Sequence, residues 1–134
     1  MPRKILIIED DANLLYGMQA KFNVAGFQAM ADAGLSKEDV LNKIKDFKPD
    51  FIILDLILPQ VDGLELLKKI KANQETSSIP VFVFTNLSDQ NSKSRGLDLG
   101  ADYYFIKDDF SIDEFVGKVK KIIENMKKIG KIEK

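Results

Sequence analysis

Polar side chains that suit metal chemistry directly follow four short apolar segments of this sequence. They are two adjacent carboxylates, a third carboxylate, a hydroxyl and an amine: Glu9 and Asp10 after residues 4–8, Asp55 after residues 51–54, Thr85 after residues 81–84 and Lys107 after residues 103–106. A charge beside a buried segment is costly unless it is paired or bound to a metal. Carboxylates held close together also repel, and a hard divalent cation with oxygen ligands, such as Mg²⁺, relieves that repulsion. These residues therefore predict a magnesium site with a hydroxyl and an ammonium beside it.

Simpler interpretations exist for several of these side chains. Aspartate often caps helices, so Asp11 is predicted to cap the helix that follows it and Asp62 the helix that begins at Gly63. Lys107 could be a solvated surface lysine, and Thr85 could merely end a strand. The position of Lys107 after an apolar segment, level with Asp55, favours an ion pair or a phosphate contact instead.

Cysteine and histidine are both absent from all 134 residues. The lack of cysteine excludes disulfides, thiolate zinc sites and cysteine nucleophiles. The lack of histidine excludes serine triads that use it, imidazole metal ligands and phosphohistidine chemistry on this chain. The chemistry must therefore come from carboxylates, hydroxyls, amines and the backbone.

Short apolar segments alternate with amphipathic ones along the chain. Strands are predicted over residues 4–8, 27–31, 51–54, 81–84 and 103–106, and helices over residues 12–25, 36–48, 63–73, 89–99 and 111–126. Strands without polar alternation are buried on both faces, which is typical of a parallel sheet covered by helices. The sequence therefore predicts an α/β fold, a doubly wound five-stranded parallel sheet with five helices. In such folds the site lies at the carboxyl ends of the strands, where the polar residues fall.

The last two predicted helices differ in quality. Residues 89–99 are polar, contain Gly96 and offer only Leu97 and Leu99 as clear apolar anchors, so this helix is expected to be the mobile element. The final helix begins with a capping box formed by Ser111 and Glu114 and then repeats apolar residues with helical spacing.

Together these motifs resemble the receiver domain of bacterial response regulators, over about residues 3–126. The residues that carry the resemblance are Glu9-Asp10, Asp55 with Pro59 and Asp62-Gly63, Thr85, and Gly100-Ala101-Asp102 leading to Lys107. The resemblance implies a flavodoxin-like topology of the kind found in chemotaxis regulators. It also implies a two-component signalling switch rather than an enzyme, although such a domain promotes its own phosphorylation and dephosphorylation.

The resemblance further implies a role for each site residue. Asp55 would accept a phosphoryl group from a histidine kinase or a histidine phosphotransfer protein, in a reaction that depends on Mg²⁺. The surface formed by the fourth helix, the fifth strand and the fifth helix would then meet a partner. The other implied roles are metal binding by Glu9, Asp10, Asp55 and the backbone carbonyl of Ile57, phosphoryl binding by Thr85 and Lys107, and a switch role for the aromatic Tyr104.

Four positions depart from the commonest pattern of that family or vary within it. Asp108 follows Lys107 where a proline is usual, so the bond between them is expected to be trans. Asn86 follows Thr85 where a smaller residue is usual. Ile57 and Leu87 fall at variable positions that border the phosphoryl group, and both are apolar. Neither can orient an attacking water, so a long-lived aspartyl phosphate is expected.

Two other functions compete with this interpretation. Haloacid-dehalogenase-type enzymes also use an aspartate nucleophile on a similar sheet, but they need a second acid two residues later, where this chain has Ile57. The second alternative is a degenerate receiver that only binds a partner. The complete acidic set with Lys107 argues against this alternative. Turnover of a phosphatase substrate would support the enzyme, and a mass shift with a small phosphodonor would exclude the degenerate receiver.

The length suits one domain, predicted as a receiver over residues 1–126 with a lysine-rich tail over residues 127–134. A formal net charge of -1 gives no electrostatic signal for direct nucleic-acid binding or an anionic membrane. With neither a signal peptide nor a membrane span, a cytoplasmic location is expected. No effector domain follows the last helix, so a stand-alone or an excised receiver is expected, whose kinase and downstream partner the sequence does not identify.

Overall fold

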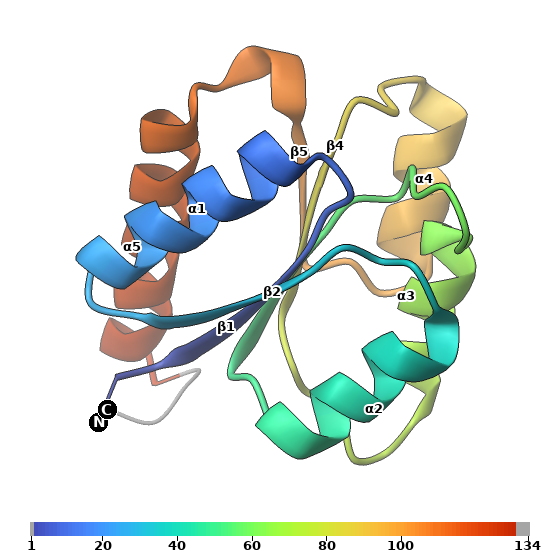
Figure 1. Ribbon diagram of the computed structural model, residues 1–134, viewed down its shortest axis with the longest axis horizontal. Coiled ribbons are helices and arrows are strands. Elements are labelled where there is room, and N and C mark those ends of the chain that lie inside the picture. Colours follow the sequence, from blue (N-terminus) through green and yellow to red (C-terminus); the bar gives the residue numbers. More distant parts are fainter. Residues whose placement is uncertain (1, 131–134) are drawn as a thin grey trace.

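A computed structural model of the chain describes residues 2–130 (Figure 1). Its elements, in chain order, are β1 (Lys4–Ile8), α1 (Ala12–Val24), β2 (Gln28–Asp32), α2 (Lys37–Phe47), β3 (Phe51–Leu54), α3 (Gly63–Ala72), β4 (Val81–Thr85), α4 (Gln90–Asp98), β5 (Tyr103–Ile106), the 3-10 turn η1 (Lys107–Asp109) and α5 (Ile112–Lys128). The predicted order of strands and helices is confirmed. The proposed tail is described only in part: α5 continues to Lys128, and residues 131–134 lie outside the described residues.

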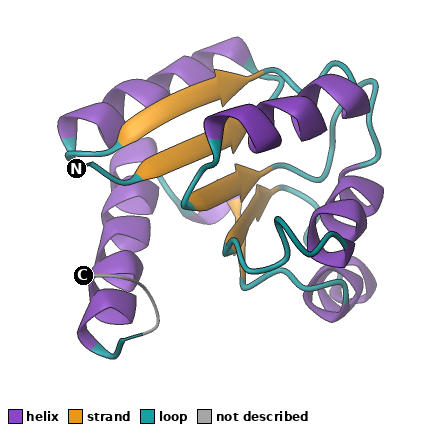
Figure 2. Ribbon diagram, turned by 90° about the horizontal axis from the view of Figure 1, so that it is seen from below, coloured by secondary structure: helices purple, strands orange, loops and turns teal. Residues whose placement is uncertain are grey.

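The strands form one sheet in the order β2-β1-β3-β4-β5, and every neighbouring pair is parallel. Helices α1 and α5 cover one face, and α2, α3 and α4 cover the other (Figure 1). This arrangement confirms the predicted doubly wound sheet with five helices. Because the strands run in the same direction, as the arrows in Figure 2 show, their carboxyl ends meet along one edge.

Apolar side chains fill both faces of the sheet, because successive residues of a strand point to opposite sides. In β1, Ile5 and Ile7 pack toward α1 and α5, whereas Leu6 and Ile8 pack toward α2 and α3. All four are fully buried, as expected for a central strand between two helical layers.

Helix α4 packs differently from the prediction. Its only buried residue is Gly96, whereas the side chain of Leu97 is 44% exposed. The expectation that Leu97 anchors this helix is therefore wrong. The physical reason is the contact at Gly96: a Cβ there would lie 2.9 Å from Cε2 of Tyr104, so the glycine lets the helix approach the ring. The next residue along the helix then turns away from the sheet. Leu99 does pack against the core.

Residues 2–130 include no helix with the length and apolar composition that a membrane crossing requires.

Candidate functional site

The acidic residues that follow β1 and β3 meet at the carboxyl edge of the sheet. Glu9, Asp10 and Asp55 each offer a carboxylate oxygen, and these oxygens lie within 4.8 Å of one another. Glu9 and Asp55 are buried and Asp10 is exposed. The strand register explains the meeting, since Ile8 pairs with Leu54 and each carboxylate follows its strand directly. The cluster predicted from the sequence is therefore present.

Lys107 reaches this cluster from the end of β5. Its Nζ lies 2.6 Å from Asp55 Oδ2, to which it donates a hydrogen bond, and 2.6 Å from Glu9 Oε1. Burial alone would lower the pKa of Lys107, but the hydrogen bonds and negative charges of Asp55 and Glu9 outweigh it and raise the pKa. Lys107 is thus held as an ammonium between two carboxylates, and the solvated surface lysine is excluded as an interpretation.

Glu9 has a buried carboxylate that shares the Lys107 ammonium with Asp55. Its Oε2 accepts a hydrogen bond from the Asp11 N–H, and its buried Oε1 forms an ion pair with Lys107 at 2.6 Å but has no other partner among residues 2–130. Burial raises the pKa of Glu9 and outweighs the contacts with Lys107 and Asp11, which lower it; the charge of Asp55 raises it further. Glu9 and Asp55 thus share one ammonium, and a further cation would relieve the repulsion that remains between the carboxylates.

These residues fit a magnesium ion. Carboxylate oxygens from three residues converge, and two of these residues, Glu9 and Asp55, share a single ammonium. Asp10 is exposed, so the site is open to the waters that Mg²⁺ retains when it binds to proteins. Asp55 Oδ1 accepts the N–H of Ile57 at 3.0 Å, which draws the loop after β3 toward the carboxylate. Ligation by the Ile57 carbonyl stays a prediction.

Thr85 ends β4, and Tyr104 lies within the neighbouring strand β5, where it pairs with Val83. Thr85 is completely buried, and its Oγ1 accepts the N–H of Leu87 at 3.3 Å. Tyr104 is partly buried, and its hydroxyl donates to the carbonyl of the same Leu87. Burial raises the pKa of Tyr104, and the charges of Asp89 and Asp55 raise it further. The backbone at Leu87 therefore connects the predicted hydroxyl and the predicted switch aromatic.

The two apolar residues predicted to border the phosphoryl group lie on different loops. Ile57, after β3, is 53% exposed at the rim of the site. Leu87, after β4, is partly buried and packs against the apolar core on the α3 and α4 side. Only Ile57 therefore presents a largely exposed side chain beside the acidic cluster.

Local predictions around the site are confirmed. Asp11 accepts the N–H of Leu14, and Asp62 accepts the N–H groups of Leu64 and Glu65, so both aspartates cap helices. A Cβ on Gly63 would lie 2.4 Å from the Leu56 Cα, which explains the glycine at this tight approach. Among residues 2–130 every peptide bond is trans, including Lys107–Asp108.

One contact beside the site escaped sequence reasoning. The Asp108 N–H donates to Asn86 Oδ1 at 3.0 Å, joining the loops that follow β4 and β5. The signal was present in the sequence, because both positions depart from the usual family pattern. Nothing in the sequence, however, indicated that they contact each other.

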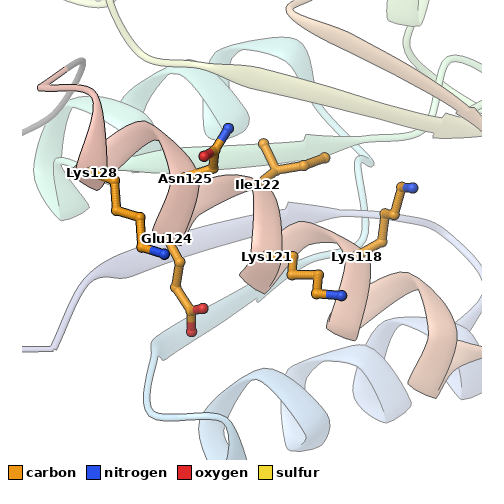
Figure 3. A pocket seen from close by; sticks show the side chains of 6 residues that line it. All are labelled: Lys118, Lys121, Ile122, Glu124, Asn125 and Lys128. Carbon is orange, nitrogen blue, oxygen red and sulfur yellow. The ribbon is translucent and has the colours of Figure 1, made fainter.

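The pocket shown in Figure 3 lies along α5, away from this cluster. It measures about 420 Å³ and is lined by Lys118, Lys121, Ile122, Glu124, Asn125 and Lys128. None of these residues belongs to the acidic cluster or to its Lys107, Thr85 and Tyr104 neighbours. The acidic cluster and its neighbours therefore lie outside this pocket.

Comparison with known proteins agrees with this geometry. The family model of the response regulator receiver domain matches residues 5–120. The response regulator ArlR of Staphylococcus aureus is 36% identical over 120 residues, which are 90% of this chain and 52% of ArlR. The chain thus spans about half the length of that relative.

Solved structures show the same likeness. The receiver domain of Francisella response regulator 1452 is 27% identical, with a TM-score of 0.78 over 92% of this chain and 98% of that one. A CheY-like receiver domain protein from Methanospirillum hungatei shares the fold, with a TM-score of 0.82, 23% identity and coverage of 96% and 98%. The chain belongs to the response regulator receiver domain family, and it is a signalling switch domain of two-component systems.

Proposed function

We propose that Asp55 is the phosphoacceptor of this receiver domain. The observation that carries the proposal is the position of its buried carboxylate, 2.6 Å from the Lys107 ammonium and within reach of Glu9 and Asp10. An acid buried with an ammonium at its side has a cation ready for the charge that a phosphoryl group brings. Phosphoryl transfer requires such positioning and charge neutralisation more than covalent assistance from the protein.

The transfer is a displacement at phosphorus. A carboxylate oxygen of Asp55 forms the new O–P bond, while the P–N bond to the histidine of a kinase or of a histidine phosphotransfer protein breaks. The bonding electrons leave with that imidazole, which takes up a proton. The donor histidine must come from the partner, since this chain has none.

Glu9, Asp10, Asp55 and the Ile57 carbonyl are the proposed magnesium ligands. When bound, Mg²⁺ supplies positive charge that neutralises the carboxylates and the incoming phosphoryl oxygens. The convergence of three carboxylates beside a single ammonium supports this assignment, because a cation would relieve their repulsion. Asp10 is the exposed member of the set and would share the ion with solvent.

Lys107 and Thr85 are the proposed phosphoryl-binding residues. Lys107 already contacts Asp55, and the Thr85 hydroxyl ends the neighbouring strand β4. Movement of Thr85 toward the phosphoryl oxygens would shift the Leu87 backbone, to which Tyr104 is bonded. Tyr104 would then turn inward and alter the surface of α4, β5 and α5, which is the proposed partner-binding surface.

We also propose that Ile57 and Leu87 lengthen the lifetime of the aspartyl phosphate. Hydrolysis, like phosphorylation, is promoted by the domain's own site and needs a water opposite the Asp55 oxygen. The exposed side chain of Ile57 lies at the rim of the site and has no hydrogen-bonding group. It therefore cannot orient that water.

The remaining proposals concern context. The receiver domain is assigned to residues 1–126, with residues 127–134 as a lysine-rich continuation that begins inside the last turns of α5. A histidine kinase or histidine phosphotransfer protein is the upstream partner, and the location is cytoplasmic. Residues 1–134 are not expected to bind nucleic acid or a membrane directly, and their downstream partner is a protein not yet identified.

The proposal is tested with acetyl phosphate as the phosphodonor. With Mg²⁺ present, the chain should gain the mass of one phosphoryl group. Asp55→Asn should abolish the gain, because the nucleophilic carboxylate is lost. Asp50→Asn is a matched control on an exposed aspartate of the opposite sheet edge, and it should be labelled like wild type. Labelling of Asp55→Asn at the wild-type level would contradict the assignment.

A further inference from the structure

The hydrogen bond between Asn86 and Asp108 extends the pairing of β4 and β5 beyond the sheet. The last paired residues are Thr85 and Ile106, after which the two strands separate. Asp108 lies in η1, whose N-cap residue Ile106 has no polar side chain to cap it. The Asn86 side chain therefore supplies, from the other loop, the acceptor that the Asp108 N–H lacks locally.

Each end of this hydrogen bond is the next residue after a proposed phosphoryl-binding side chain. Asn86 follows Thr85, and Asp108 follows Lys107. The bond consequently constrains the distance between the backbone that carries the hydroxyl and the backbone that carries the ammonium. The Lys107 ammonium contacts only Asp55 and Glu9 among residues 2–130. Neither contact joins the β5 loop to the β4 loop, as the Asn86–Asp108 hydrogen bond does.

The bond needs one feature at each position, and this chain has both. Position 86 must carry a side-chain acceptor, which alanine or glycine lacks. Position 108 must carry a backbone N–H, which proline lacks. Asn86 supplies that acceptor and Asp108 supplies that N–H.

We propose that Asn86 is a positioning residue for phosphoryl transfer, acting through the backbone N–H of Asp108 to hold Lys107 in register with Thr85. The proposal rests on the proposed function of Asp55, Thr85 and Lys107. Asn86 and Asp108 are both exposed, so water can replace the bond if it is lost and the effect on global stability is small. The effect on the rate of phosphoryl transfer is larger, because the rate depends on how accurately the Lys107 ammonium is placed.

The experiment compares single substitutions in the full chain, with acetyl phosphate and Mg²⁺ as the probe. Asn86→Ala removes the acceptor and Asp108→Pro removes the N–H. Asp108→Ala is the matched control, because it removes only the side chain and keeps the N–H. Asn91→Ala is a second control, on an exposed asparagine of α4. The readouts are the rate of Asp55 labelling, the melting temperature and the amide exchange rate of Asp108.

Asn86→Ala and Asp108→Pro should each label about two- to tenfold more slowly than wild type, which is the effect of losing one ordinary hydrogen bond in the transition state. The double variant should be no slower than the slower single variant. Both controls should label like wild type. The Asp108 amide should exchange faster in Asn86→Ala, while the melting temperature changes no more than in Asn91→Ala.

Other outcomes would contradict either the positioning role of Asn86 or the phosphoacceptor assignment of Asp55. If wild type is labelled on Asp55 and Asn86→Ala is labelled at the same rate, the positioning role is wrong and the phosphoacceptor assignment stands. If Asp108→Ala is as slow as Asp108→Pro, the side chain rather than the N–H is responsible. If wild type is not labelled at all, the proposed function fails, and the positioning role fails with it.

Discussion

Helices α4 and α5 lie on opposite faces of the sheet beside β5, yet they bury very different surfaces (Figure 1). The apolar residues that α5 buries are Phe115, Val116, Val119, Ile123 and Met126, and a capping box closes its first turn. The only residue that α4 buries is Gly96. Because apolar burial is the main source of helix stability in a protein, we expect α5 to be held more firmly than α4.

Strand β5 connects the two regions. Tyr103 and Phe105 pack on the α5 side, where Phe105 meets the ring of Phe115 at 5.6 Å between centroids. Tyr104 points the other way and packs against Gly96 of α4. A rigid layer therefore supports one face of the strand, while the proposed switch residue lies under the weakly held helix on the other. If Tyr104 acts as the proposed switch, we expect its movement to reach α4 rather than α5.

The largest expected difference is in amide exchange. Amides of α4 should exchange through local opening, with an opening free energy of at most a few kcal/mol. For amides in the α5 core, the opening free energy should approach the free energy of global unfolding, about 5–15 kcal/mol. Exchange measured by NMR or mass spectrometry under native conditions distinguishes them. Exchange in α4 as slow as in α5 would contradict the comparison.

Truncation of one side chain on each helix should give the next largest difference. Phe115 is fully buried and stacks on Phe84 at 3.7 Å between centroids, so Phe115→Ala should lower the free energy of unfolding by about 3–5 kcal/mol. Leu97→Ala should change it by about 0.5 kcal/mol or less, because that side chain is largely exposed. Urea denaturation of both variants measures the difference. Equal losses would show that α4 contributes as much to the core as α5.

Magnesium should stabilise the fold as a whole rather than α4 in particular. Binding to the native state alone adds about 2.7 kcal/mol when Mg²⁺ is present at 100 times its dissociation constant. Exchange in α5 should slow accordingly, because global unfolding releases the ion, whereas local opening of α4 does not. Asp10→Asn should weaken the effect, and Asp39→Asn, on an exposed aspartate of α2, is the control. A melting temperature that Mg²⁺ leaves unchanged would count against the site.

The smallest expected effect concerns the loops beside the site. Ile57→Asn and Leu87→Glu each introduce a side chain that can hydrogen-bond the attacking water. Each should speed dephosphorylation by up to ten- to hundredfold, which corresponds to about 1 to 3 kcal/mol in the activation free energy of hydrolysis. Ile57 is the more exposed, so its variant should act with less effect on stability than Leu87→Glu, which disturbs the core beside α4. The intrinsic dephosphorylation rate with Mg²⁺ present is the measurement. A double variant no faster than wild type would show that these residues do not control the lifetime.

Much of the fold was predictable because its signals are local. The fully apolar segments of β3 and β4 indicated strands buried on both faces, and such strands require helices on both sides. The caps at Asp11, Asp62 and Ser111 were predictable as well, because a cap bonds to backbone only two or three residues away. The same logic placed the acidic residues at one edge, since parallel strands end together.

The tertiary structure alone decided which side chains meet there and how. Lys107 lies between Asp55 and Glu9, although the first of these contacts spans 52 residues. The outward turn of Leu97, the approach of Gly96 to Tyr104 and the bond from Asp108 to Asn86 likewise depend on how distant segments pack. Local sequence determines backbone preference and burial, because those depend on neighbours along the chain. Side-chain contacts between loops depend instead on strand register and helix position, which only the assembled sheet defines.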